Sequence, residues 1–349
     1  MSGHPDVRGL EVESVTDWLT TNLASATAPF RFELIAAGGS NLTYRVTDDA
    51  GRVVALRRPP EGQGLATAHD MDREWRIMSA LGAAGAVPVP ECLAQCNDAA
   101  VTGAPFYVMS FVDGLIIRDT KDAATLDRAQ AEIATASLIA AQVGFHTLDL
   151  GAVGLGDLGR HDGYVTRQLK RWRTQIERAD ARPVPLLNDL HTRLVAATPP
   201  ERARPALAHG DYRFDNVVLG ADLDVAAVLD WELCTTGDPI ADFAWSAQYW
   251  ADPGEDFTWL VDAPTRAPAF PRRVEVIRQY EQATGFDLSD FAFYEAFSWW
   301  KHACIVEGVY ARRLRGAQGG MTQSGPPSDI AGRVDIMLER AHELVGAID

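Results

Sequence analysis

One short stretch near the middle of the chain constrains its fold more than any other feature. Residues 209–216 read HGDYRFDN and run into an apolar segment at 217–219. A second apolar segment at 225–229 leads into the tripeptide DWE at 230–232. Short apolar segments on either side of a turn, here Gly-Ala-Asp at 220–222, predict two β-strands joined as a hairpin.

The polar residues around this hairpin have the spacing that phosphoryl transfer requires. Such a site places a carboxylate beside the attacking hydroxyl and holds Mg²⁺ against the nucleotide phosphates. Protein kinases use an Asp, an Asn five residues later and a second Asp further along the chain. Asp211 and Asn216 have that interval, and Asp230, at the exit of the second strand, is predicted to lie beside Asn216. An isolated His-Gly-Asp is weak evidence for a catalytic site, because loops are generally polar. Its combination with a hairpin and the DWE tripeptide is hard to produce by accident.

With these motifs the chain resembles the aminoglycoside phosphotransferase family, in particular the branch related to the kinase-like domain of certain acyl-CoA dehydrogenases. The resemblance covers roughly residues 30–315. It implies an α+β, protein-kinase-like fold of two lobes. The N-terminal lobe, residues 1–112, is expected to hold an antiparallel sheet with one main helix, and the larger C-terminal lobe, residues 113–349, to be mostly helical. It also implies phosphorylation of small-molecule hydroxyls, with ATP or GTP as the donor and Mg²⁺ as cofactor.

The resemblance implies roles for several polar residues in and after the central stretch. Asp211 is expected to be the catalytic base, and Asn216 and Asp230 to be the Mg²⁺ ligands. Arg213 takes the place where protein kinases carry a Lys and is expected to neutralise charge on the moving phosphoryl group. His209 is expected to brace the loop through hydrogen bonds.

In the N-terminal region, segments 30–35, 42–47 and 52–57 have the composition of strands separated by turns. Ser40 and Asn41 lie in the Gly-rich turn between the first two. Glycines and small polar residues there would let backbone N–H groups approach nucleotide phosphates. Without the motifs that follow it, this segment would be interpreted as an ordinary hairpin turn.

Arg57 ends the third of these segments, at the place where kinases carry a phosphate-contacting Lys. Arg keeps the charge and adds a bidentate fork, but it is bulkier. The helix predicted over 68–81 carries Glu74, which would pair with Arg57 and orient it. The alternative is a solvent-facing Glu74 that pairs with Arg73 or Arg76 on its own helix.

The strand predicted over 105–112 is the second candidate for nucleotide contact. In a kinase-like fold this strand runs into the hinge, where main-chain groups bind adenine. Ser110 and Val112 are the expected positions. A buried strand without ligand contact is the alternative.

Composition narrows the partners and leaves the acceptor open. With 48 acidic against 32 basic residues, the net charge of −16 disfavours a nucleic-acid partner. No apolar run is long enough for a membrane span and no secretory signal is visible, so a cytoplasmic protein is expected. Oligomeric state cannot be predicted.

The acceptor is expected to be small, because the segment after Asp230 is too short for a kinase activation loop. One candidate is an aminoglycoside-like compound, which the acidic balance favours. The other is a hydroxyacyl thioester or related metabolite, favoured by the branch resemblance and by the basic helix 164–178. That helix is either a solvated face or an anion site. A non-catalytic nucleotide-binding module is the alternative to any kinase.

Overall fold

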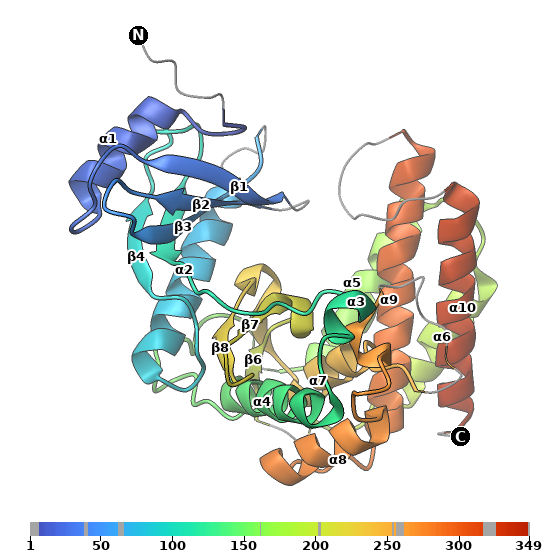
Figure 1. The fold of residues 1–349 in the computed structure, drawn as a ribbon. Helices are drawn as coiled ribbons and strands as arrows, with labels where there is room; N and C mark the ends of the chain where they lie inside the picture. The colour runs from blue at the N-terminus through green and yellow to red at the C-terminus, as the bar shows by residue number, and fades with distance from the viewer. Residues whose placement is uncertain are drawn as a thin grey trace. The chain divides into compact units, whose positions relative to one another are not determined.

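The computed structural model describes residues 7–37, 41–61, 66–160, 162–201, 204–252, 255, 262–316 and 326–347, the side chains of 66–70 excepted. These residues form two compact units, traced in Figure 1. Unit 1 holds the described residues up to Asp113 together with Ala227–Glu232, and unit 2 holds the rest. The DWE tripeptide therefore belongs to unit 1, although it is distant from the rest of that unit in the sequence.

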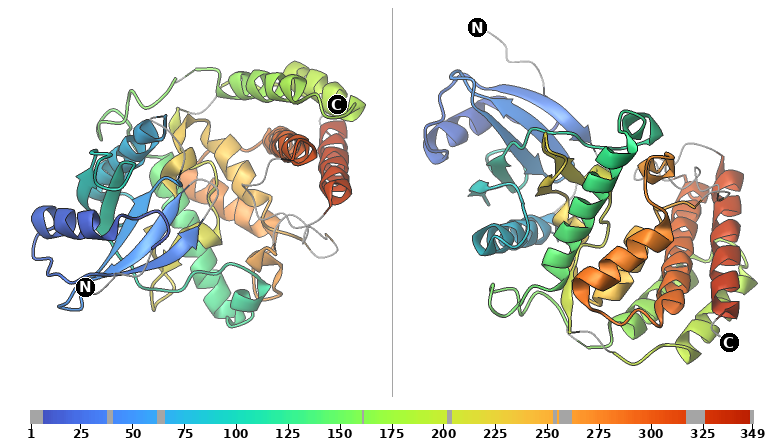
Figure 2. Two further views of the ribbon diagram at one scale, coloured as in Figure 1. Left: turned by 90° about the horizontal axis from the view of Figure 1, so that it is seen from above. Right: turned by 60° about the horizontal axis from the view of Figure 1, so that its bottom comes forward.

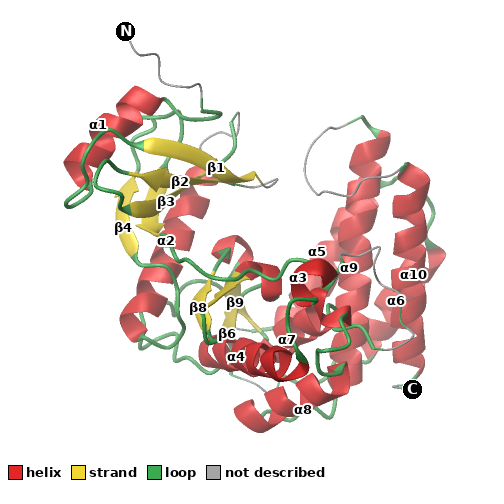
Figure 3. Cartoon of the chain, viewed as in Figure 1, coloured by secondary structure: helices red, strands yellow, loops and turns green. Residues whose placement is uncertain are grey.

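Unit 1 is built on a five-stranded antiparallel sheet (Figure 3). Its elements are α1 (Val12–Asn22), β1 (Arg31–Ala37), β2 (Leu42–Thr47), β3 (Val53–Arg58), α2 (Ala66–Ala84), β4 (Cys92–Cys96) and β5 (Phe106–Ser110). The strands lie in the order β1-β2-β3-β5-β4, and each neighbouring pair is antiparallel. The antiparallel N-terminal sheet predicted from the sequence is confirmed.

Alternation along the strands decides which side chains reach which helix. Successive residues of a strand point to opposite faces of the sheet. Leu56 of β3 and Val108 of β5 join the apolar core that includes Leu19 of α1. Arg57 and Tyr107, each one residue away, are directly opposite one another across β3 and β5. They point to the other face, which α2 covers.

Unit 2 is mostly helical. Its helices are α3 (Thr120–Ala123), α4 (Arg128–His146), α5 (Tyr164–Ala179), α6 (Pro185–Ala196), α7 (Pro239–Ala247), α8 (Arg273–Thr284), α9 (Phe291–Leu314) and α10 (Pro327–Gly346). Most of α9 is buried, and it packs against α5, α6, α7 and α10. Helices α9 and α10 run side by side (Figure 2). An apolar surface all round a helix requires burial on all sides, so α9 forms the centre of this helical group.

Four short strands complete the fold: β6 (Ala206–Ala208), β7 (Val217–Leu219), β8 (Val225–Val228) and β9 (Thr235–Gly237). β7 pairs with β8, which confirms the predicted hairpin, and β6 pairs with β9. The HGDYRFDN stretch connects β6 to β7 and contains the 3₁₀ turn η1 (Phe214–Asn216). Across the part of the chain that the structure describes, none of the helices combines the length and apolar character needed to cross a bilayer.

Candidate active site

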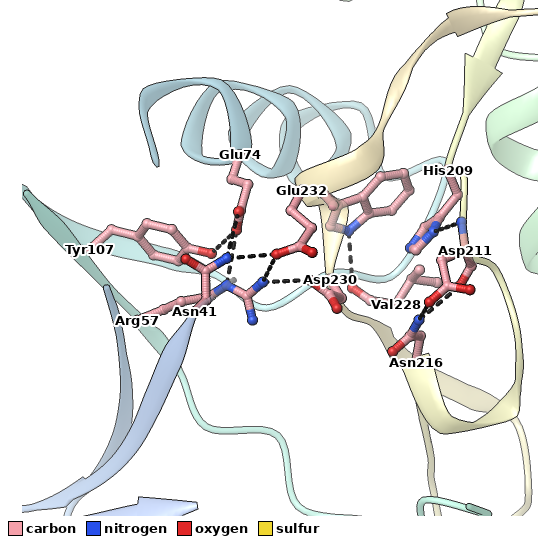
Figure 4. A network of polar contacts seen from close by, with 11 residues as sticks. Asn41, Arg57, Glu74, Tyr107, His209, Asp211, Asn216, Val228, Asp230 and Glu232 are labelled. Atoms are coloured by element: carbon pink, nitrogen blue, oxygen red, sulfur yellow. Dashed lines mark hydrogen bonds and ion pairs between the residues drawn. The ribbon is translucent and has the colours of Figure 1, made fainter. Parts of the chain in front are cut away.

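Arg57 lies among three carboxylates in unit 1 (Figure 4). Its Nε is 3.0 Å from Oε2 of Glu74 on α2. Its Nη2 pairs with Asp230 and lies 3.4 Å from Oε2 of Glu232. The Arg57–Glu74 pairing predicted from the sequence is present, and Glu74 is buried rather than facing solvent.

The charges around Arg57 shift the pKa values of the groups in this network. Burial alone lowers the pKa of Arg57, but the nearby Glu74, Tyr107, Asp230 and Glu232 more than offset it, and the net shift is upward. Burial also raises the pKa of Glu74, against the lowering effects of Arg57 and of the hydrogen bond that Tyr107 donates at 2.7 Å. One guanidinium faces three carboxylates, so the network carries excess negative charge and favours a further cation.

Asn41 belongs to the same network. Its amide nitrogen donates to Oε2 of Glu232 at 2.8 Å and to Oε1 of Glu74 at 3.3 Å. The side chain of Asn41 is therefore bound to carboxylates, and contact of its turn with nucleotide phosphates stays a prediction. Ser40, the other residue assigned to that turn, lies outside the described residues.

Glu232 was not predicted as a site residue, although the DWE motif contains it. The turn after β8 brings it to Arg57. Asp230 adopts a positive φ of 64°, which is uncommon for a residue with a Cβ. The buried Trp231 anchors the turn, because its Nε1 donates to the carbonyl of Val228 at 3.1 Å. The DWE motif is the sequence signal that could have identified Glu232, because Asp230, the first residue of that motif, is a predicted Mg²⁺ ligand.

The two proposed hinge positions differ in what their main-chain groups do. Ser110 ends β5, and its N–H donates to the carbonyl of Glu91 at 2.8 Å. Its Oγ accepts from the N–H of Glu91 at 2.9 Å. Val112 follows the strand, and no hydrogen bond of its main chain occurs within the described residues.

In unit 2, Asp211 and Asn216 are hydrogen-bonded to one another (Figure 4). The Asn216 amide nitrogen donates to the Asp211 carbonyl at 2.7 Å and to its Oδ2 at 3.2 Å. Arg213 Nε lies 3.4 Å from Oδ1 of Asp211 and 2.9 Å from Oδ1 of Asp215. The Asp211 side chain remains 26% exposed. A ligand can therefore still reach this carboxylate, although Asn216 and Arg213 hold it in place.

Buried groups behind this loop fix its backbone. Asp242 of α7 accepts hydrogen bonds from the N–H groups of His209 at 3.0 Å and Gly210 at 2.8 Å. His146 Nε2 lies 3.0 Å from the same carboxylate, and His146 Nδ1 lies 2.6 Å from the Tyr280 hydroxyl. Burial would raise the pKa of Asp242, but the hydrogen bond and charge of His146 lower it below its usual value. Asp242 therefore supports the loop from behind, and His146 packs and hydrogen-bonds against it.

Two residues beside Asp211 escaped the sequence reasoning. Burial raises the pKa of Asp215 to about 6, with Arg213 opposing the shift and Asp211 adding to it. Burial and the charge of Asp211 raise the pKa of Tyr249, whose ring lies 5.0 Å from the Arg213 guanidinium carbon. Asp215 stands inside the HGDYRFDN motif and could have been found there, whereas no local pattern marks Tyr249.

The donor atoms suit Mg²⁺, which prefers oxygen and usually keeps few protein ligands beside phosphate oxygens. Because the Asn216 nitrogen faces Asp211, its amide oxygen remains as an acceptor. Asp230 offers a carboxylate that is 33% exposed. Within the described residues no three acidic, His or Cys side chains gather closely enough to hold a metal by themselves.

Comparison with known proteins decides the family. Residues 31–294, about three quarters of the chain, match the phosphotransferase enzyme family. The chain belongs to this family.

Two proteins illustrate what this phosphotransferase-family chain is similar to. It is 37% identical over 292 residues to acyl-CoA dehydrogenase family member 11 of Gallus gallus, which covers 80% of this chain but 36% of that protein. The chain thus spans about a third of the length of this curated relative. A solved structure of a candidate aminoglycoside phosphotransferase from Ralstonia eutropha is 29% identical, with a TM-score of 0.81 over 97% of this chain and 98% of that one.

A streptomycin–ATP ternary complex of APH(2")-IIa has the same fold, with a TM-score of 0.59 and 12% identity over 86% of this chain and 91% of that one. The kinase-like fold predicted from the sequence is therefore confirmed.

Proposed function

We propose that this protein transfers the γ-phosphoryl group of ATP or GTP to a hydroxyl of a small molecule. Membership of the phosphotransferase family supports the reaction class. The observation that carries the proposal is the hydrogen-bonded pair of Asp211 and Asn216, held from behind by Asp242. A carboxylate that is fixed in place and still exposed is what a hydroxyl acceptor requires.

In this reaction Asp211 would orient the acceptor hydroxyl and take up its proton. Its carboxylate is restrained by Asn216 and Arg213, so little reorganisation would be needed when the hydroxyl binds. Arg213 would then offset negative charge on the moving phosphoryl group. Asn216 and Asp230 are the proposed Mg²⁺ ligands, through the oxygens described above. Mg²⁺, when bound, neutralises charge on the nucleotide phosphates.

The remaining assignments concern the nucleotide. Arg57, oriented by Glu74, would contact phosphate oxygens, and its fork allows two parallel hydrogen bonds. Ser40 and Asn41 would contribute to the phosphate turn. Main-chain groups at Ser110 and Val112 remain the proposed adenine contacts; for Ser110 the N–H is already bonded to Glu91, which leaves Val112 as the freer of the two. The ATP present in the APH(2")-IIa complex supports a nucleotide donor.

For the acceptor, two classes compete. The aminoglycoside phosphotransferase structures support an aminoglycoside-like compound. The acyl-CoA dehydrogenase family relatives support a hydroxyacyl thioester or related metabolite. A non-catalytic nucleotide-binding module is the second candidate function. One observation favours it: Arg57 stands where a Lys is expected and is paired with Asp230, a proposed Mg²⁺ ligand.

Asp211→Asn tests the proposed chemistry. Asn keeps the size of the side chain but cannot accept the proton, so phosphorylation should fall by roughly 10²–10⁴-fold. Affinity for ATP–Mg²⁺ should change little, because Asn216 and Asp230 remain. Slow ATP hydrolysis serves as the assay, with water as the acceptor, and equilibrium nucleotide binding serves as the control. A variant as fast as the parent would overturn the role of Asp211, and a parent that binds nucleotide without any turnover would favour the binding module.

A further inference from the structure

Lys301 of α9 is a half-buried cation whose place in unit 2 the proposed chemistry does not explain. Its Nζ lies 4.4 Å from the centre of the Trp245 ring on α7. No carboxylate lies within salt-bridge reach of it among the described residues. A buried charge is costly unless it is paired, so an unpaired ammonium points to a partner that arrives from outside.

Two hydrogen-bond donors without a partner among the described residues lie on α7 and the residue that follows it, Trp245 and Gln248, and both of these residues contact His302, the neighbour of Lys301. Trp245 is buried, and its indole N–H has no hydrogen-bond partner within the described residues. The same holds for Nε2 of the buried Gln248, whose other amide atom contacts His302 at 2.9 Å. Buried polar groups are nearly always hydrogen-bonded. The indole N–H of Trp245, whose ring Lys301 contacts, is therefore a donor that an anionic group could use.

A second set of cations lies on α5, which packs against α9. Arg167, Lys170 and Arg171, with Arg178, line a shallow groove of about 460 Å³. Arg171 lies close enough to Lys301 for its charge to act on the lysine, and so does Asp211. Lys301 is thus within electrostatic range of both the basic groove and the proposed catalytic carboxylate.

The pKa of Lys301 agrees with this geometry. Burial lowers it to about 8, with Asp242 opposing the shift, Arg171 adding to it and Asp211 opposing it. Lys301 therefore stays mostly protonated near neutral pH, although it has lost much of its hydration. A desolvated cation binds an anion more strongly than a hydrated one does.

We propose that Lys301, together with Arg171 and the α5 groove, binds an anionic group of the acceptor, a phosphate or a carboxylate. This inference rests on the proposed function and names its substrate class: a hydroxyl compound that carries negative charge. A polycationic acceptor would meet repulsion here, despite the net charge of −16 for the whole chain. Local charge at the site, rather than overall charge, then selects the acceptor.

The test compares Lys301→Met with Lys121→Met. Methionine keeps the length and the apolar contact with Trp245 and removes the charge. Lys121 is exposed on α3 and supplies the same charge change away from the site. Pyrophosphate and malonate serve as phosphate and carboxylate probes, titrated by calorimetry with ADP present.

At least one probe should bind Lys301→Met roughly 10- to 100-fold more weakly than the parent, as expected for loss of a charge-assisted hydrogen bond. Lys121→Met should match the parent, and Lys301→Arg should restore most of the affinity. If Lys301→Met does not fold, Arg171→Met on the exposed helix surface should show a loss in the same direction. Equal affinity of the parent and the charge-removing variants for both probes would overturn the inference.

A kinetic comparison separates this inference from the proposed function. Glycerol 3-phosphate, glycerol and kanamycin offer an anionic, a neutral and a cationic acceptor. The anionic compound should have the lowest KM, and Lys301→Met should raise that KM far more than it lowers kcat. Probe binding that depends on Lys301 in a protein without any turnover would support the anion site and refute the kinase. Turnover with kanamycin as the best acceptor would refute the anion site and support the kinase.

Discussion

Replacement of Arg57 by Met should destabilise unit 1 in a way that depends on pH. Glu74 is 1% exposed and has Arg57 as its nearest cation. Removal of one partner of a buried ion pair costs about 3–5 kcal/mol, because the other charge is left uncompensated. The loss of contact with Asp230 and Glu232 should add little, since these carboxylates are 33% and 20% exposed.

The pH dependence follows from the carboxyl of Glu74. Its pKa is already raised in the folded protein by burial, and removal of Arg57 should raise it further. A group with a raised folded pKa stabilises the fold below its unfolded pKa, here about 4.3, and that stability is lost as pH rises through the folded value. The cost of Arg57→Met should therefore be smaller at pH 5 than at pH 8.

The assay is urea denaturation of parent and variants at both pH values. Arg58→Met is the matched control, because Arg58 is the neighbouring buried arginine of the same strand but donates to Thr102 and Pro59 instead of to a carboxylate. Its cost should be nearly the same at both pH values. The double variant Arg57→Met with Glu74→Gln should cost less than the sum of the single variants, by roughly 0.5–3 kcal/mol. A cost of Arg57→Met that does not change with pH, together with additive single variants, would refute the ion-pair reasoning.

Two further predictions concern the loops that carry the polar residues. Gly210 has a φ of 87°, and a Cβ there would lie 2.9 Å from Cβ of Leu233. Gly210→Ala should therefore destabilise the fold by at least about 1 kcal/mol and lower turnover more than nucleotide affinity. Gly220→Ala is the comparison, and equal effects of the two variants in unfolding and turnover assays would contradict this prediction. Asp230→Ala should abolish the part of nucleotide affinity that depends on Mg²⁺, measured by calorimetry with and without the metal. Nucleotide affinity in the parent that is indifferent to Mg²⁺ would contradict the assignment of Asp230 as a ligand.

The sequence by itself determined the contacts that form within short stretches of the chain. The interval between Asp211 and Asn216 is closed by hydrogen bonds inside one loop. The alternation along β3 separated Arg57 from Leu56, because side chains of a strand must point to opposite faces. Contacts of this kind depend on bond geometry over a few residues, so a pattern is enough to predict them.

Tertiary packing decided the contacts that join distant segments. Asn41 meets Glu232 across 191 positions of sequence, and no local pattern indicates that the phosphate turn and the DWE tripeptide share a network. The same is true of Tyr249 beside Asp211 and of Lys301 over Trp245. Which polar side chains are buried together, and which remain unpaired, depends on how whole helices and strands pack. The sequence therefore predicted the reaction class and the basic helix 164–178, whereas the position of Lys301 against Trp245 depended on how α7 and α9 pack.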